Sequence, residues 1–117
     1  MVSLEEIRSY CLLKREVSED LPFDDTTLVF RVYGKIFLLT NIESAASINL
    51  KCEPSLAIEL REKYPEITPG YHMNKRHWNT LSLRGSLNSK QIFELIDHSY
   101  NMVVKTFPKS VQHALSV

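Results

Sequence analysis

The stretch TTLVFRVYGKIFLLT, residues 26–40, decides the fold. Apolar residues recur at every second position from Leu28 to Val32, which is the period of a strand with one buried face. Gly34-Lys35 fits a two-residue turn of the Gly-X type, and residues 36–40 then supply a returning strand. The stretch therefore predicts a β-hairpin.

The residues before the hairpin predict a helix followed by a loop. Ser3 to Glu6 fits a capping box, with Ser3 as the N-cap and Glu6 at the third helical position. Apolar residues then recur at helical spacing, so we expect a helix over residues 4–15. Pro22 and the pair Asp24-Asp25 indicate that the chain leaves this helix through a loop.

The residues after the hairpin predict a third strand, a helix, further strands and a last helix. Residues 46–52 alternate as a strand does, and Pro54 suits the first turn of a helix that stops at Pro65. Residues 78–84 alternate again, and the segment near Tyr71 is a candidate for one more strand. Asn88, with Gln91 three residues later, fits the cap of a last helix that ends before Pro108.

This order, α-β3-α-β2-α, predicts the fold class. Consecutive strands with short links favour an antiparallel sheet, and amphipathic helices would cover one face of it. We expect a two-layer α+β domain over residues 1–117, with the second face of the sheet open to solvent or to a partner.

Composition excludes several classes. The chain has 117 residues, 44% of them hydrophobic and 24% charged, which suits one soluble domain. There is no apolar run near the roughly 18 residues that a membrane span needs, and the N-terminus lacks a secretory signal pattern. Cys11 and Cys52 lie far apart within apolar patterns, so we expect buried free thiols. The prediction is a cytoplasmic monomer with no membrane contact.

Charge is unevenly distributed although the formal net charge is zero. Residues 1–30 carry a net charge of −4. Residues 67–93 carry +4, because they contain four cations and no Asp or Glu: Lys75, Arg76, Arg84 and Lys90. Such a local excess favours an anionic partner.

The only Trp of the chain lies beside this cationic cluster, within TPGYHMNKRHWNTL at residues 68–81. Strand alternation puts Leu81 and Leu83 in the core with Asn79 in line, and turns Trp78 to the opposite face. An exposed Trp beside Lys and Arg suits nucleic acid, because cations neutralise phosphates and an aromatic ring stacks on bases. The alternative is structural: Trp78 packs over its neighbours, and the cations form a solvated turn.

Metal binding and catalysis find little support. His72, His77 and His98 do not match the close ligand spacing of a structural zinc site, so we expect no metal and no cofactor. Asp97, His98 and Ser99 are adjacent on a predicted helix and diverge around its axis, so they cannot form a catalytic triad among themselves. Three glycines, at positions 34, 70 and 85, cannot build a phosphate loop. We therefore expect no enzyme activity.

The motif INLKCEPSLAIELREKYPEITPGYHMNKRHWNTL, residues 48–81, together with LIDHSY at residues 95–100, resembles the MmcQ/YjbR family. The resemblance extends from about Leu28 to Val104, and Glu53 departs from the family pattern, which has Asp there. It implies a small α/β fold similar to type III secretion chaperones and more loosely to frataxin-like sheets.

The family is commonly described as DNA-binding through a double-wing arrangement. Carried over to this chain, the resemblance implies contact by Asn74, Lys75, Arg76, His77 and Trp78. We add Arg84 and Lys90 from charge alone, with Tyr71 beside Trp78 as a contact to sugar or base.

Two functions therefore remain open after the sequence alone. The first is binding of double-stranded DNA by the surface around residues 71–90. The second is a protein-interaction or chaperone-like module that binds a protein partner on the open sheet face, with Trp78 as an apolar anchor.

Overall fold

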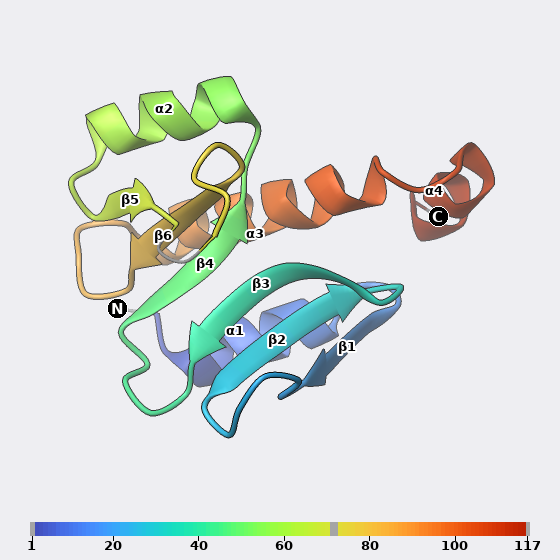
Figure 1. Ribbon diagram of the computed structural model, residues 1–117, viewed down its shortest axis with the longest axis horizontal. Coiled ribbons are helices and arrows are strands. Elements are labelled where there is room, and N and C mark those ends of the chain that lie inside the picture. The colour runs from blue at the N-terminus through green and yellow to red at the C-terminus, as the bar shows by residue number, and fades with distance from the viewer. Residues whose placement is uncertain (1, 71–72, 117) are drawn as a thin grey trace.

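The computed structural model of the chain describes residues 2–70 and 73–116 (Figure 1). The hairpin predicted from residues 26–40 lies within a single antiparallel sheet. The strand order is β1-β2-β3-β4-β6-β5, and each neighbouring pair is antiparallel. The elements follow one another as α1 (Leu4–Leu12), β1 (Val17–Asp20), β2 (Thr27–Val32), β3 (Lys35–Asn41), β4 (Ser47–Lys51), α2 (Pro54–Lys63), β5 (Ile67–Pro69), β6 (Trp78–Ser82), α3 (Ser89–Val104) and α4 (Lys109–Ser116).

The predicted α+β class is confirmed, with two additions to the predicted order. β1 is a four-residue edge strand, and α4 follows Pro108. Each capping box forms as the sequence predicts: Ser3 with Glu6 opens α1, and Asn88 with Gln91 opens α3. Helix α1 is shorter than predicted and ends at Leu12.

The hairpin turn is one residue earlier than predicted. β2 ends at Val32 and β3 begins at Lys35, so the turn residues are Tyr33 and Gly34 rather than Gly34 and Lys35. Both have positive φ, 46° and 80°, as a type I′ turn requires. The ring of Tyr33 packs edge-on against Phe107, 6.0 Å between centroids, and this contact helps offset the strain of a left-handed tyrosine.

One face of the sheet carries the core. α1 and α3 lie behind the sheet in the view of Figure 1, while α2 packs beside β5. The predicted register of β6 is confirmed: Leu81 and Leu83 are buried with Asn79, and Trp78 and Thr80 point to the other side. The side chains that fill the core include Phe30, Phe37, Leu38, Ile48, Leu50, Ile92 and Ile96.

A β-bulge in the hairpin shapes this core. The register shifts between Phe30 and Arg31, so that Phe30 faces Leu38 while Arg31 faces Ile36. Phe37 lies in the shifted region and is buried together with Leu38, although the two are adjacent in the chain. The ring of Phe37 meets Tyr100 of α3 edge-on, 5.5 Å between centroids.

Candidate functional site

The segment before Trp78 is a turn that Asn74 organises. Its side-chain oxygen accepts from the backbone N–H of Arg76, 3.0 Å, as in an Asx turn. Its carbonyl accepts from the N–H groups of His77 and Trp78, at 3.1 and 3.0 Å. Asn74 therefore stabilises the turn through both its side chain and its own backbone.

Three further hydrogen bonds tie this turn to the rest of the chain. Gly70 N–H donates to Trp78 O, 2.8 Å. Cys52 N–H donates to His77 O, 2.7 Å, at the junction of β4 and α2. The guanidinium of Arg61 on α2 donates to Lys75 O, 3.2 Å. The turn is thus anchored on three sides, and part of its motif builds the fold.

The residues predicted to bind DNA do not form one surface. Lys75 and Arg76 are exposed, and His77 and Trp78 next to them are half-buried. Arg84 follows the far end of β6 and Lys90 lies in the first turn of α3, so neither adjoins the Asn74 turn. Tyr71 lies outside the described residues.

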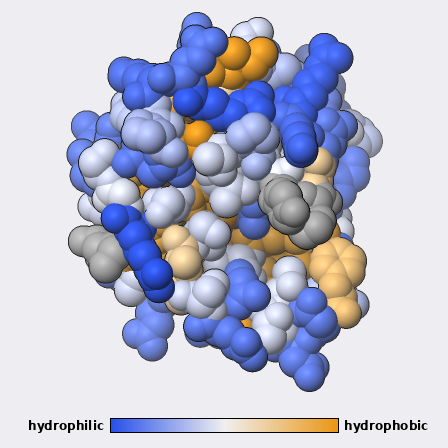
Figure 2. Space-filling view, turned by 60° about the vertical axis from the view of Figure 1, so that its left-hand side comes forward, coloured by the Kyte–Doolittle hydropathy of each residue, from blue (hydrophilic) through white to orange (hydrophobic). Residues whose placement is uncertain are grey.

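An apolar groove occupies the open face of the sheet. Its volume is about 530 Å³, and its apolar lining comes from the loop after β1, from β3, and from the Asn74 turn with β6: Phe23, Ile36, Leu39, Met73 and Trp78. Figure 2 shows a hollow at the right of the view in which hydrophobic colour continues inward between hydrophilic side chains. The sequence did not assign Phe23, Ile36 or Leu39 to a site, although Phe23 is an exposed loop Phe and Leu39 has the strand parity of the open face.

Polar groups surround this apolar lining. Thr80 Oγ1 donates to Asn49 Oδ1, 2.6 Å, so the polar side chains on the floor are already paired. Lys51 pairs with Trp78 in the sheet register and shares with it an adjoining hollow of about 410 Å³. Lys51 therefore borders the Trp78 end of the groove, and the exposed Lys75 and Arg76 belong to the turn that precedes Trp78.

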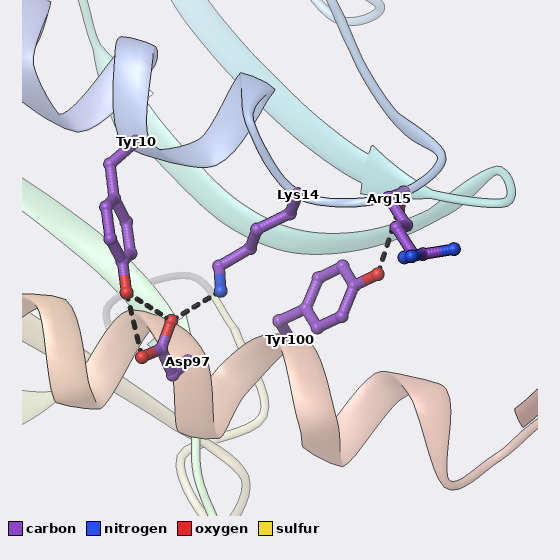
Figure 3. Close-up of polar contacts among 5 residues, drawn as sticks. All are labelled: Tyr10, Lys14, Arg15, Asp97 and Tyr100. Atoms are coloured by element: carbon purple, nitrogen blue, oxygen red, sulfur yellow. Dashed lines mark hydrogen bonds and ion pairs between the residues drawn. The ribbon is translucent and has the colours of Figure 1, made fainter. Parts of the chain in front are cut away.

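The second motif of the sequence, LIDHSY, lies on α3, and each of its last four residues makes a contact with another part of the chain. The carboxylate of Asp97 accepts from the hydroxyl of Tyr10, 2.7 Å, and pairs with Lys14 Nζ (Figure 3). The hydroxyl of Tyr100 donates to Arg15 O, 2.8 Å. Both contacts fix α1 and the residues after it to α3. Burial and the hydrogen bond to Asp97 raise the pKa of Tyr10 to about 12, so this hydroxyl remains a donor.

His98 and Ser99 point to other places. His98 Nε2 accepts from Glu53 N–H, 3.1 Å, at the start of α2, where the Glu53 carboxylate also caps Ser55 and Leu56. The buried hydroxyl of Ser99 donates to Phe37 O, 2.5 Å, and accepts from Lys51 N–H, 2.8 Å. Asp97, His98 and Ser99 therefore diverge, as their adjacency predicts, and each makes a contact that stabilises the fold.

The stability of the chain is expected to depend on pH through His98. Burial and, to a lesser degree, Lys105 lower the pKa of His98 in the folded chain below its usual 6.5. The unfolded chain therefore takes up a proton first as the pH falls, so the contribution of neutral His98 is complete above pH 6.5 and decreases as the pH falls toward the folded pKa.

The variant His98→Gln tests this dependence, because glutamine still accepts from Glu53 N–H and does not titrate. Urea unfolding between about pH 7 and pH 5 should show a shallower fall of unfolding free energy for the variant than for the parent chain. Equal slopes in the two proteins would contradict the assignment.

Residues 2–70 and 73–116 contain no group of three or more His, Cys, Asp or Glu placed to hold a metal ion. No helix in the same part of the chain is long and apolar enough to cross a membrane. Both cysteines are buried and unbridged, as predicted, and burial raises the pKa of the Cys52 thiol to about 11.

A family model described as YjbR matches residues 12–102, a range that contains the Asn74 turn, the open face and the LIDHSY motif. The chain belongs to the YjbR family. Among curated YjbR relatives, the "Uncharacterized protein YjbR" of Escherichia coli (strain K12) is 30% identical over 115 residues, 97% of this chain and 98% of the relative. The "Uncharacterized protein YbdF" of Escherichia coli O157:H7 is 37% identical over 92 residues, 78% of this chain and 75% of the relative.

Solved structures agree with the fold. A crystal structure of a protein from Deinococcus radiodurans matches with a TM-score of 0.90 and 35% identity, over 100% of this chain and 90% of the other. A crystal structure from Pseudomonas syringae matches with a TM-score of 0.74 and 32% identity, over 86% of this chain and 98% of the other. The two-layer YjbR architecture is therefore shared with experimentally determined relatives.

Proposed function

We propose that this YjbR protein is a binding module whose open sheet face receives an extended apolar segment of a partner protein. The observation that carries the proposal is the groove of about 530 Å³ on a sheet face that no described helix covers. Phe23, Leu39 and Trp78 supply the kind of apolar and aromatic anchors that dominate the energy of protein interfaces.

The charges around the groove favour a segment with an acidic end. Lys51 borders the Trp78 end, and the exposed Lys75 and Arg76 precede Trp78 in the chain, so these three cations would pair with carboxylates there. The loop that supplies Phe23 carries the exposed Asp24 and Asp25, and these repel a uniformly anionic ligand. A peptide that combines apolar side chains with a few acidic ones at one end matches both features.

Fluorescence of Trp78, the only Trp of the chain, tests this proposal directly. The probe is a synthetic peptide of about ten residues that alternates Leu and Thr and ends in two Glu, and its partner probe has Gln in place of Glu. We expect a saturable change in Trp78 emission with both peptides and tighter binding of the Glu peptide, with a difference that shrinks at high salt.

Leu39→Asp provides the matched variant, because Leu39 lines the groove and is only partly buried. It should weaken peptide binding at least about tenfold. Ile58→Asp makes the same change at an exposed site on α2, 52% exposed, and should leave binding unchanged. Equal losses in the two variants, or no emission change with either peptide, would refute the proposal.

DNA is the second candidate, and the exposed pair Lys75 and Arg76 beside Trp78 favours it. In an anisotropy titration of labelled duplex DNA, Lys75→Ala with Arg76→Ala should weaken binding and lower the salt slope by about 2, one unit for each lost phosphate contact. The control is Arg84→Ala with Lys90→Ala, which removes two cations away from the turn. Equal behaviour of the two double variants would show that the Asn74 turn does not bind DNA.

A further inference from the structure

A second, smaller groove lies on the other side of the sheet, between α2 and α3. Its volume is about 330 Å³, and Leu56, Leu60, Tyr64, Leu87 and Leu95 make most of its walls. A water-sized chamber of about 10 Å³ adjoins it, since Leu60, Leu95 and His98 line both. The chamber therefore lies on the sheet side of the groove, since Leu50, Asn79 and Leu81 also line it.

Asn79 lines the inner chamber, and its side chain is unsatisfied. The residue is 1% exposed, and neither Oδ1 nor Nδ2 has a hydrogen-bond partner among the residues that the structure describes. Asn79 faces Leu50 of β4 and Pro69 of β5 in the sheet register. An apolar residue at this position would pack without the free-energy cost of an unpaired buried amide. A buried amide without a partner among the described residues favours an additional polar group at this position.

The chamber restricts what that group can be. A volume of about 10 Å³ admits roughly one oxygen or nitrogen atom with its hydrogens. That one atom must accept from Nδ2 and donate to Oδ1 of Asn79. A hydroxyl does both, whereas a carboxylate lacks the proton for Oδ1 and an ammonium lacks the lone pair for Nδ2.

The lining of the chamber favours a neutral head group, whereas Glu94 lines only the outer groove. Burial raises the pKa of the Cys52 thiol to about 11 and lowers the pKa of His98, so both side chains are uncharged at neutral pH. Lys51 also borders the chamber, but it follows Leu50 in β4, and strand alternation turns its side chain to the open face.

We propose that the groove between α2 and α3 binds a small apolar molecule that ends in a hydroxyl group, and that Asn79 receives this hydroxyl. The apolar body lies against Leu56, Leu60 and Leu95, and the hydroxyl enters the inner chamber. The groove volume lies near the lower end of the usual range for small-molecule sites, which suits a short aliphatic alcohol or a phenol. This site is independent of the open sheet face.

Three probes with the same tail test the head-group requirement on the unaltered protein: 1-hexanol, hexylamine and hexanoate at pH 7. Titrations followed by ¹H–¹⁵N NMR should show shifts of the Asn79 side-chain amide and of the Leu60 and Leu95 backbone with 1-hexanol. Hexylamine and hexanoate should bind at least about tenfold more weakly, because each leaves one Asn79 atom unpaired in a buried chamber. Equal binding of the three probes, or shifts confined to other residues, would overturn the proposal.

Two variants extend the test. Asn79→Leu should abolish the preference for 1-hexanol, and the ligand-free variant should unfold at the same temperature as the parent or higher, because no buried amide is left unpaired. Asn49→Leu changes an asparagine on the opposite face of the sheet and should leave 1-hexanol binding unchanged. If Asn79→Leu instead unfolds at a lower temperature and 1-hexanol does not bind the parent, an internal water alone satisfies Asn79 and the proposal fails.

Discussion

Replacing Ser99 by alanine is expected to lower the free energy of unfolding by about 3 kcal/mol. The Ser99 hydroxyl lies where β3 and β4 separate, just beyond the last paired residues Leu38 and Leu50. There the hydroxyl replaces a backbone hydrogen bond between the two strands, because it donates to Phe37 O and accepts from Lys51 N–H. Ser99 is 0% exposed, so the substitution leaves a buried carbonyl and a partly buried N–H without a partner, each worth roughly 1 to 3 kcal/mol.

Urea unfolding of Ser99→Ala measures this loss. The matched control is Ser9→Ala, which removes a hydroxyl from an exposed position on α1 and should change stability by less than about 0.5 kcal/mol. A loss below about 1 kcal/mol in Ser99→Ala would mean that β3 and β4 close the gap themselves or that water enters. Either outcome would show that Ser99 does not stabilise the separation of β3 and β4.

The sequence predicts the elements whose signals are local. The two capping boxes, at Ser3 and Asn88, are short patterns whose hydrogen bonds form within one turn, and both are present. The register of β6 follows from simple alternation, so the burial of Asn79 and Leu81 is also as predicted. Such features do not depend on what the rest of the chain does.

Features that depend on tertiary contacts were missed. β1 has one apolar residue, Val17, and is a strand because it pairs with β2 and because ion pairs fix its carboxylates: Glu19 with Arg8, 2.5 Å, and Asp20 with Arg31, 2.9 Å. The bulge at Phe30 places the adjacent residues Phe37 and Leu38 on the same buried side, which no period-two pattern shows.

The same division holds for the candidate sites. The Asn74 turn is a local motif, and the sequence pointed to it. The open groove brings together Phe23, Leu39 and Trp78 from segments that only the folded sheet places side by side. The LIDHSY motif is the opposite case, because its Asp, His and Ser are residue types common in active sites. In the structure they instead connect α3 to α1, α2 and the sheet.

Gly70→Ala is expected to destabilise the chain by about 2 kcal/mol and to change the emission of Trp78. A Cβ on residue 70 would lie 2.8 Å from Trp78 Cβ and 3.0 Å from Trp78 O. These atoms belong to the backbone and the root of the side chain, so no change of rotamer relieves the contact. β5 and β6 would have to separate, which stretches the hydrogen bond from Gly70 N–H to Trp78 O.

Gly34→Ala is the informative comparison for this prediction. Gly34 has φ of 80° but open space where a Cβ would lie, so its substitution costs only the backbone strain of about 1 kcal/mol. Turn preferences alone would rank Gly34 as the more sensitive position, whereas close approach to Trp78 ranks Gly70 first. Urea unfolding together with Trp emission decides between the two positions. A larger loss of unfolding free energy in Gly34→Ala, or unchanged emission in Gly70→Ala, would contradict the prediction. Either result would show that β5 can move away from β6 without disturbing Trp78 or the open groove that it lines.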